Sequence, residues 1–145
     1  MNKKKIIYIA EFSLPNMSAY AVHVLKMCDN FCKYADVELI IPHKKSSYIF
    51  KKIKKEYLLK ENFKITSLFS SKKRPSLFNR IYFSLKINNY LNFNNYNMII
   101  SRSIISSLML AFLGKKNILE IHSEMTGPTK YLFKISKLYV IVKPV

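Results

Sequence analysis

Short apolar runs alternate along the chain with longer segments in which apolar residues recur every three or four positions. The first two runs, residues 6–10 and 37–41, are rich in branched aliphatic residues, as buried strands are. Between them, apolar residues at 21, 25, 28, 32 and 35 give residues 18–35 one helical stripe. Ser18 or Asn16 can cap this helix. The first forty residues therefore predict a βαβ unit.

The same alternation continues to the end of the sequence. A helix in the basic stretch 43–62 would have one apolar and one cationic face. A later helix is capped by Ser76, and the Asn-rich residues 88–97 are typical of its end and the loop that follows. Gly114 ends a compact apolar helix at 104–113. The apolar stripe of the helix that Ser76 caps is Phe78, Ile81, Tyr82 and Leu85. The remaining segments predict strands at 63–69, 98–100, 118–121 and 138–142, and a short helix at 130–137.

Strands that alternate with helices require a mostly parallel sheet with helices on both faces. Crossovers between parallel strands are right-handed, so the sequence predicts an α/β fold with a doubly wound, Rossmann-like sheet. The chain has 145 residues, enough for one such domain. Because no helix follows the last predicted strand, we expect residues 1–145 to form one domain whose carboxyl end is incomplete.

Composition narrows the class of protein. Half of the residues are hydrophobic, so the chain can bury a core, and with only 2 glycines it has no glycine-rich phosphate loop. The longest apolar run, residues 104–113, is far shorter than the ~20 residues that span a bilayer. The apolar stretch after the amino-terminal lysines ends at Glu11, too soon for a signal peptide. We therefore expect a cytoplasmic protein.

Cys28 and Cys32 are four residues apart, which places both on one face of the predicted helix, beside Leu25 and Ala35. A metal site needs more ligands nearby, and none fit this pair. We therefore expect buried thiols in the helix core and no metal.

The charge balance favours an anionic partner. The chain carries 25 Lys and Arg against 8 Asp and Glu, a net charge of +17. Only Arg74, Arg80 and Arg102 are arginines, the residue on which nucleic-acid readers rely, so nucleic-acid binding is a minor alternative. Abundant Lys, Asn and Ile are also what an AT-rich genome produces, and much of the excess charge is then a solvated surface.

The stretch 43–62 interleaves lysines with aromatic and aliphatic residues. We expect Lys51, Lys52, Lys54 and Lys55 to lie on an anionic membrane surface, where each lysine contributes ~1 kcal/mol. This would make the protein peripheral on the inner face of the cell membrane. The alternative is an ordinary solvated helix face.

Two parts of the sequence resemble one enzyme family. Residues 4–42 contain the segments KKIIYIA, HVLKM and VELII, and residues 99–124 contain IISRS and LEIHS. These segments resemble the amino-terminal domain of family 4 (group 1) glycosyltransferases of the GT-B fold, and the order of elements is similar along essentially the whole chain. Many members have paired glycines after the first strand, whereas this loop is FSLPNMS at residues 12–18. Either the donor diphosphate approaches the loop differently, or the chain belongs to a subgroup that uses small residues.

The resemblance implies what the chain does and what it lacks. In such enzymes the first domain binds mainly the acceptor, and the second binds the nucleotide sugar and carries a Glu-x7-Glu motif. No two glutamates of this sequence are eight residues apart. The implied parent reaction is retaining transfer of a sugar from a nucleotide-sugar donor to a glycan or lipid-linked acceptor, with no cofactor. We expect this chain alone, as an acceptor-side domain, to be inactive.

Other functions remain open at this point. The chain could be a non-catalytic binding subunit that pairs with a separately encoded donor domain. It could also be a basic nucleic-acid-binding α/β protein, or the inert product of a disrupted gene.

The candidate site residues lie where strands end and helices begin. The resemblance implies that His122, at the end of the fifth predicted strand, faces the donor sugar as a catalytic residue; the alternative is an ordinary loop histidine. Arg102 follows the fourth strand, where a fixed cation can hold a phosphate or an acidic sugar or make a surface pair. The start of the first helix favours an anion, and His23, one turn later, can face the cleft or pack. The predicted acceptor- or phosphate-binding set is Ser18, Ala19, Tyr20, His23, Arg102, Ser103 and Glu124.

Overall fold

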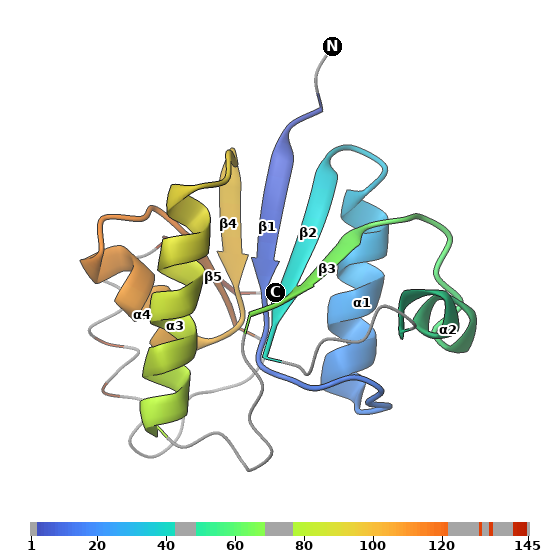
Figure 1. Cartoon of the computed structure of the whole chain (residues 1–145), viewed down its shortest axis with the longest axis horizontal. Coiled ribbons are helices and arrows are strands. Elements are labelled where there is room, and N and C mark those ends of the chain that lie inside the picture. The colour runs from blue at the N-terminus through green and yellow to red at the C-terminus, as the bar shows by residue number, and fades with distance from the viewer. Residues whose placement is uncertain are drawn as a thin grey trace.

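The computed structural model describes residues 3–42, 49–68, 77–121, 131, 134 and 141–144 of the chain. In these residues a six-stranded sheet has the order β3-β2-β1-β4-β5-β6, and every neighbouring pair is parallel (Figure 1). This is the doubly wound, Rossmann-like sheet that the sequence predicts. The strands are β1 (Lys5–Ile9), β2 (Asp36–Ile41), β3 (Lys64–Ser67), β4 (Met98–Ser101), β5 (Ile118–Ile121) and β6 (Ile141–Pro144).

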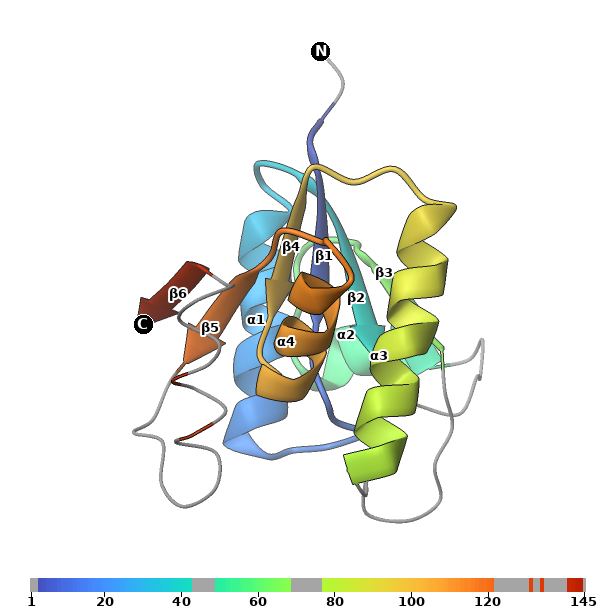
Figure 2. The same cartoon turned by 90° about the vertical axis from the view of Figure 1, so that its left-hand side faces the viewer.

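Helices cover both faces of this sheet (Figure 2). Tyr8 of β1 packs among the residues of one face, whereas Ile7 and Ile9 pack with Phe83 on the other. Because both sides of the central strands are buried, these strands read as continuous apolar runs in the sequence. The helices of the first face are α1 (Ala19–Phe31) and α2 (Ile49–Glu56), and those of the second are α3 (Leu77–Asn92) and α4 (Ile104–Phe112).

Helix α1 confirms its predicted stripe and cap. The Ser18 hydroxyl accepts a hydrogen bond from the Ala21 amide at 3.2 Å, and the Asn16 side chain accepts one from the Ser18 amide at 2.9 Å. The helix ends at Phe31, earlier than predicted. All five members of the predicted stripe are buried: Ala21, Leu25, Cys28, Cys32 and Ala35.

Both cysteine thiols are free and buried, as the sequence predicts. Burial raises the pKa of Cys28 well above its ordinary value and the pKa of Cys32 to about 11. At neutral pH both groups are therefore protonated, inert thiols.

Helix α3 is turned differently from the prediction. Of the predicted stripe, Phe78 is 81% exposed, and Tyr82 and Leu85 are each 45% exposed. The buried stripe is Phe83, Ile87 and Leu91, together with Ser84.

The serine explains which apolar side of α3 faces inward. The Ser84 hydroxyl lies 3.1 Å from the Ser106 hydroxyl of α4, so small residues let the two helices approach closely. Turning α3 to bury Phe78 would remove this contact. Two apolar stripes are present in the sequence, and the helix–helix contact selects between them.

The remaining elements follow the predictions with small shifts. Gly114 ends α4 with a φ of +78°, the left-handed conformation expected at that position. Strand β6 lies at residues 141–144 rather than 138–142, and residues 138–140 lie outside the described ranges, as does Ser76. Of the predicted helix at 130–137 only Tyr131 and Lys134 are described, and both are helical. In the described ranges no helix is long and apolar enough to cross a bilayer.

Candidate functional site

The strand order places a topological switch point between β1 and β4. The chain leaves β1 toward β2 on one side and leaves β4 toward β5 on the other, and open α/β sheets bind ligands at the carboxyl edge of such a point. Glu11 follows β1, and Arg102 and Ser103 follow β4. The Arg102 amide donates to the Ile9 carbonyl at 3.0 Å, which holds the two strand ends together.

Glu11 is held by side chains from two helices on the α3–α4 face. Ser103 and Ser106 donate hydrogen bonds to one oxygen of its carboxylate, and Arg80 Nε lies 3.0 Å from the other. The Ser103 hydroxyl also caps α4, accepting from the Ser106 amide at 3.1 Å. A carboxylate is stable at this position because the start of a helix favours negative charge. A substrate phosphate at Ser103 would have to compete with the chain's own Glu11.

A second cluster of polar side chains lies on the α1 side of the same edge. Its centre is Glu120, a buried residue of β5, which Tyr8 contacts by donating a hydrogen bond from its hydroxyl. Arg102 Nε lies 3.7 Å and His23 Nε2 lies 3.5 Å from the same Glu120 oxygen. The cluster therefore joins β1, α1, β4 and β5 around one carboxylate.

Arg102 is the buried cation of this cluster. Its guanidinium lies over the Tyr20 ring at 4.5 Å from the centroid, and Tyr20 in turn contacts Phe12 edge to face. The Arg102 side chain is only 7% exposed, and among the described residues its buried Nη1 atom has no hydrogen-bond partner. A buried guanidinium donor with no acceptor is unfavourable, so this N–H group is suited to donate a hydrogen bond to an anionic or hydroxyl-bearing ligand.

Burial also fixes the protonation of the two tyrosines. It raises the pKa of Tyr8, and the hydrogen bond to Glu120 raises it further. Burial likewise raises the pKa of Tyr20, although the Arg102 cation opposes the change. Both hydroxyls therefore remain protonated at physiological pH.

The structure brings together only some of the predicted site residues. His23 and Arg102 lie at Glu120 and the Tyr20 ring lies against Arg102, whereas Ser18 and Ser103 each cap a helix, and Ala19 opens α1. The predicted catalytic His122 and the predicted binding residue Glu124 lie outside the described ranges.

Sequence reasoning missed Glu120 itself. The available signal was a single glutamate inside the apolar strand Ile118–Ile121, because a charge at such a place is buried and requires partners. Among the residues that the structure describes, no three His, Cys, Asp or Glu side chains gather closely enough to hold a metal ion.

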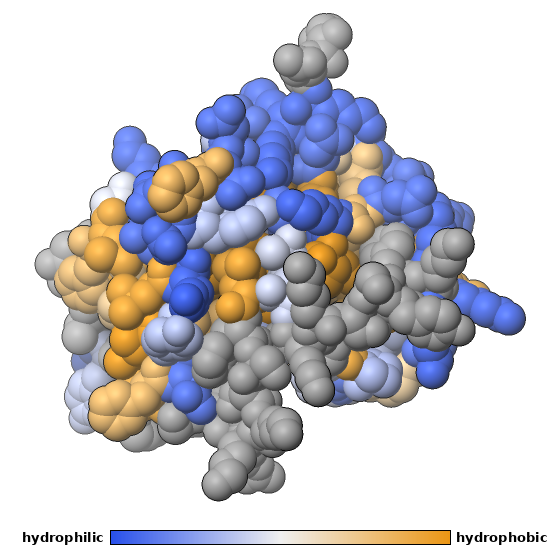
Figure 3. All heavy atoms as spheres, viewed as in Figure 1, coloured by the Kyte–Doolittle hydropathy of each residue, from blue (hydrophilic) through white to orange (hydrophobic). Residues whose placement is uncertain are grey.

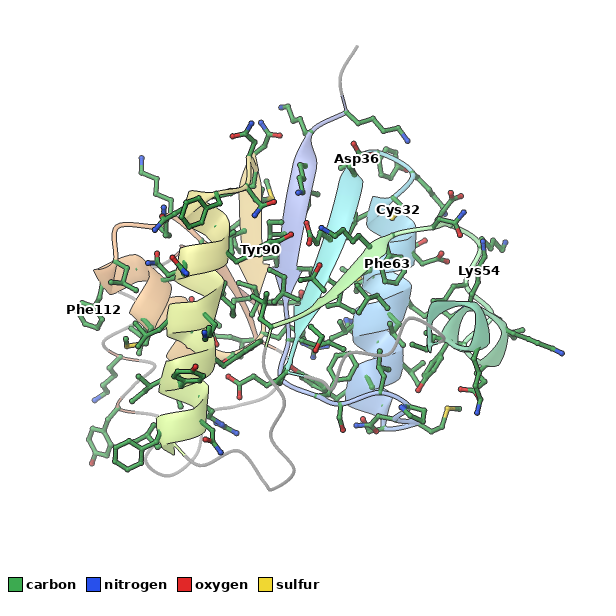
Figure 4. The ribbon with its side chains drawn as sticks, in the orientation of Figure 1. Cys32, Asp36, Lys54, Phe63, Tyr90 and Phe112 are labelled. Atoms are coloured by element: carbon green, nitrogen blue, oxygen red, sulfur yellow. The ribbon has the colours of Figure 1, made fainter. Side chains whose placement is uncertain are left out.

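A third charged cluster, also missed, joins the sheet to α3 away from the switch point. Glu38 of β2 is 1% exposed and is surrounded by four donors. Burial alone would raise its pKa, but hydrogen bonds from Thr66, Tyr90, Lys5 and Lys64 outweigh burial and lower the pKa to about 2. Tyr90 reaches this carboxylate from α3, pointing toward the sheet (Figure 4). The cluster joins α3 to the sheet.

Helix α2 carries the lysines that the sequence predicts at a membrane. Ile53 and the following Tyr57 are buried in the core, so these two side chains cannot enter a membrane. Lys54 Nζ donates to the Asn62 side chain at 2.8 Å, and Lys52 lies 3.6 Å from Glu56. Lys55 is exposed. The Lys51 side chain is outside the described part of the structure.

Comparison with known proteins identifies the fold. No protein-family model matches the sequence, and no curated protein matches it. A solved structure, apo UGT2 from Phytolacca americana, matches 93% of this chain with a TM-score of 0.58 and 12% identity. UGT2 is a GT-B glycosyltransferase. The chain has the fold of one GT-B half.

The chain spans 33% of the length of the UGT2 chain. The carboxyl-terminal domain of PF1911 hydrogenase from Pyrococcus furiosus (residues 83–215) also matches, over all of this chain and 94% of that one. Its identity is 14% and its TM-score is 0.43, too low to support an argument. In the GT-B half, the Glu120 cluster and Arg102 lie at the carboxyl edge of the sheet beside the switch point.

Proposed function

We propose that this chain is the acceptor-side domain of a glycosyltransferase. The parent reaction transfers a sugar from a nucleotide-sugar donor to a glycan or lipid-linked acceptor, with retention of configuration at the sugar. The GT-B-like fold supports the class of enzyme. The stereochemistry and the acceptor-side role come from the sequence resemblance to family 4. On this proposal the chain binds acceptor but does not complete the transfer by itself.

The observation that carries the proposal is the buried Arg102 at the switch point. Its Nη1 atom has no hydrogen-bond partner in the part of the chain that the structure describes, and the Tyr20 ring and the Glu120 carboxylate hold the guanidinium in place. A fixed guanidinium binds phosphate or carboxylate oxygens with two parallel hydrogen bonds. A phosphate-linked acceptor therefore matches this position. The neighbouring His23 adds a second polar group, 38% exposed at its side chain.

Acceptor binding can be measured on the purified chain by amide NMR. The probes are N-acetylglucosamine linked through pyrophosphate to a short geranyl chain, and UDP-glucose as a representative donor. We expect the acceptor probe to shift the amide signals of Tyr20, His23 and Arg102 and UDP-glucose to shift few signals. Arg102→Gln should abolish these shifts, whereas Lys116→Gln, at an exposed lysine on the amino side of β5, should preserve them.

Two results would contradict the proposal. The first is binding of UDP-glucose but not of the acceptor probe at this edge, because the site would then belong to the donor. The second is transfer of labelled sugar by the chain alone, since a half-enzyme has no turnover. If Arg102→Gln alters the circular dichroism spectrum, Arg102→Lys keeps the charge and should weaken acceptor binding without abolishing it.

A further inference from the structure

The outer side of α3 is an apolar surface that the fold leaves uncovered. We call it the α3 patch: Leu77, Phe78, Ile81, Tyr82 and Leu85. Leu77 is more than half exposed, and Ile81 is half-buried. The patch lies on the side of α3 opposite to Phe83 and Ile87, which pack on the sheet. The space-filling view shows hydrophobic residues gathered over α3 and α4 (Figure 3).

The α3 patch is restricted to the first half of the helix. On the same side, the second half carries the exposed residues Asn89 and Asn92. Helix α3 begins at the carboxyl edge of the sheet, where Arg80 reaches Glu11 beside the switch point. The apolar surface is therefore next to the candidate site rather than spread along the molecule.

The charged side chains that α3 itself contributes are all positive. Residues 62–119 contain no Asp or Glu and carry nine Lys and Arg. Lys86 extends over the Tyr82 ring, with its Nζ atom 5.4 Å from the centroid. An apolar patch on a helix that carries Lys86 and no acidic residue, in a chain of net charge +17, matches a partner that is anionic and also offers hydrocarbon.

The positive charge of the chain also distinguishes between the partners that could cover the α3 patch. A second copy of the chain would bring two bodies of net charge +17 together, which like-charge repulsion opposes. Nucleic acid would pair with the cations and stack on Phe78 and Tyr82, but it offers nothing apolar to Leu77, Ile81 and Leu85. An anionic bilayer accepts all three groups: aliphatic residues, aromatic rings at the interface, and lysines at the headgroups.

We propose that the α3 patch docks the protein on an anionic membrane. Phe78 and Leu85 enter the boundary between headgroups and acyl chains, and Lys86 contacts lipid phosphates. The attachment is peripheral and reversible, because a few side chains enter the bilayer. This inference goes beyond the proposed transferase function and holds whether or not that function is correct. It places the membrane contact on α3, whereas Ile53 of α2 is buried in the core.

A single tryptophan can report the contact, since the chain contains none. Phe78→Trp places the reporter in the α3 patch. Tyr34→Trp is the matched control, because Tyr34 is as exposed as Phe78 but follows α1 on the other face. With vesicles of roughly one third phosphatidylglycerol in phosphatidylcholine, we expect the Phe78→Trp emission to move to shorter wavelength and to be quenched by brominated lipids. Tyr34→Trp should show neither change.

Vesicle sedimentation separates the apolar and electrostatic contributions. Phe78→Ser with Leu85→Ser should weaken binding to acidic vesicles by roughly tenfold, and both side chains are exposed enough for the fold to persist. Lys52→Gln with Lys55→Gln on α2 should change it by less than about twofold. Equal binding to phosphatidylcholine alone, or a Tyr34→Trp response equal to that of Phe78→Trp, would overturn the proposal. A dimer in the absence of lipid would also overturn it if the Phe78→Ser, Leu85→Ser variant were monomeric, because the α3 patch would then bind a second copy of the chain.

Discussion

The two faces of the sheet bury their helices in different ways. On the α1–α2 face, large apolar side chains such as Leu25, Ile53 and Tyr57 are buried in one core cluster. On the α3–α4 face, the two helices meet through Ser84 and Ser106, and large side chains such as Phe78 point outward. The first face uses its apolar residues for stability. The second face uses small residues at the helix contact and keeps a large apolar surface outside.

This difference separates folding from recognition. A helix that is apolar on one side is satisfied once it packs on the sheet, as α1 is. Helix α3 is apolar on two sides. One side packs on the sheet, and the other is exposed and available to a partner. Helices α3 and α4 contribute no acidic side chain of their own, because six of the eight acidic residues precede residue 62 and none lies between 62 and 119. The α3–α4 face is therefore where we expect the molecule to contact its surroundings.

The strongest test of this comparison uses two phenylalanines on one helix. Phe83→Ala should lower the free energy of unfolding by about 3–5 kcal/mol, because it empties a site that is 1% exposed. Phe78→Ala should change it by less than about 0.5 kcal/mol. Urea denaturation followed by circular dichroism measures both. Equal losses would mean that both sides of α3 are buried in solution, and the division between the faces would disappear.

Much of the fold follows from the pattern of apolar residues, but the orientation of α3 does not. The stripe of α1 is the single apolar side of that helix, so periodicity alone predicts the burial of Leu25 and Cys28. Helix α3 offers two stripes of similar hydrophobicity, and the choice between them depends on Ser84 meeting Ser106, a contact between residues 22 apart. Contacts of that kind are not visible in local periodicity.

The candidate site was predictable to a similar degree. Parallel strands predict that Tyr20, His23 and Arg102 gather at one edge, and the structure places them together. Glu120 lies at the centre of the cluster and also accepts a hydrogen bond from Tyr8. The two residues are 112 positions apart in sequence, and no spacing rule links them. The roles of His122 and Glu124, outside the described residues, stay predictions.

The second test concerns Glu38, which ties α3 to the sheet. Its pKa in the folded protein is about 2, below the ordinary value of 4.5, so its contribution to stability is present above that value and is lost as the pH falls toward 2. Glu38→Gln should therefore lower the free energy of unfolding at pH 7 by on the order of 3 kcal/mol. It should also flatten the loss of stability between pH 5 and 2, roughly the interval between the two pKa values.

Glu56→Gln on α2 is the matched control from the other face. Glu56 forms an exposed pair with Lys52, so its loss should change stability by less than about 0.5 kcal/mol at any pH. Unfolding by urea at a series of pH values provides the measurement. If both variants have the same pH profile, Glu38 does not hold α3 on the sheet, and the proposed tie between helix and sheet is wrong.

The smallest expected effect compares two helix ends of the same geometry, one on each face. After α2, the Leu59 amide donates to the Lys54 carbonyl at 3.0 Å, and Leu58 between them has a φ of +49°. After α4, the Lys115 amide donates to the Leu110 carbonyl at 2.8 Å around Gly114. A left-handed residue at this position favours glycine, because any other side chain crowds its own backbone.

Exchanging the residues at these two ends should change stability in opposite directions. Leu58→Gly should raise the free energy of unfolding by about 1 kcal/mol, since the Leu58 side chain is 77% exposed and contributes little burial. Gly114→Ala should lower it by a similar amount, through backbone strain alone, because a Cβ atom there would meet no other atom within 4 Å. Thermal unfolding of both variants beside the parent chain is the measurement. A destabilised Leu58→Gly variant would show that the Leu58 side chain makes a stabilising apolar contact on the α1–α2 face. The exposed apolar residues of that face would then contribute to stability as well.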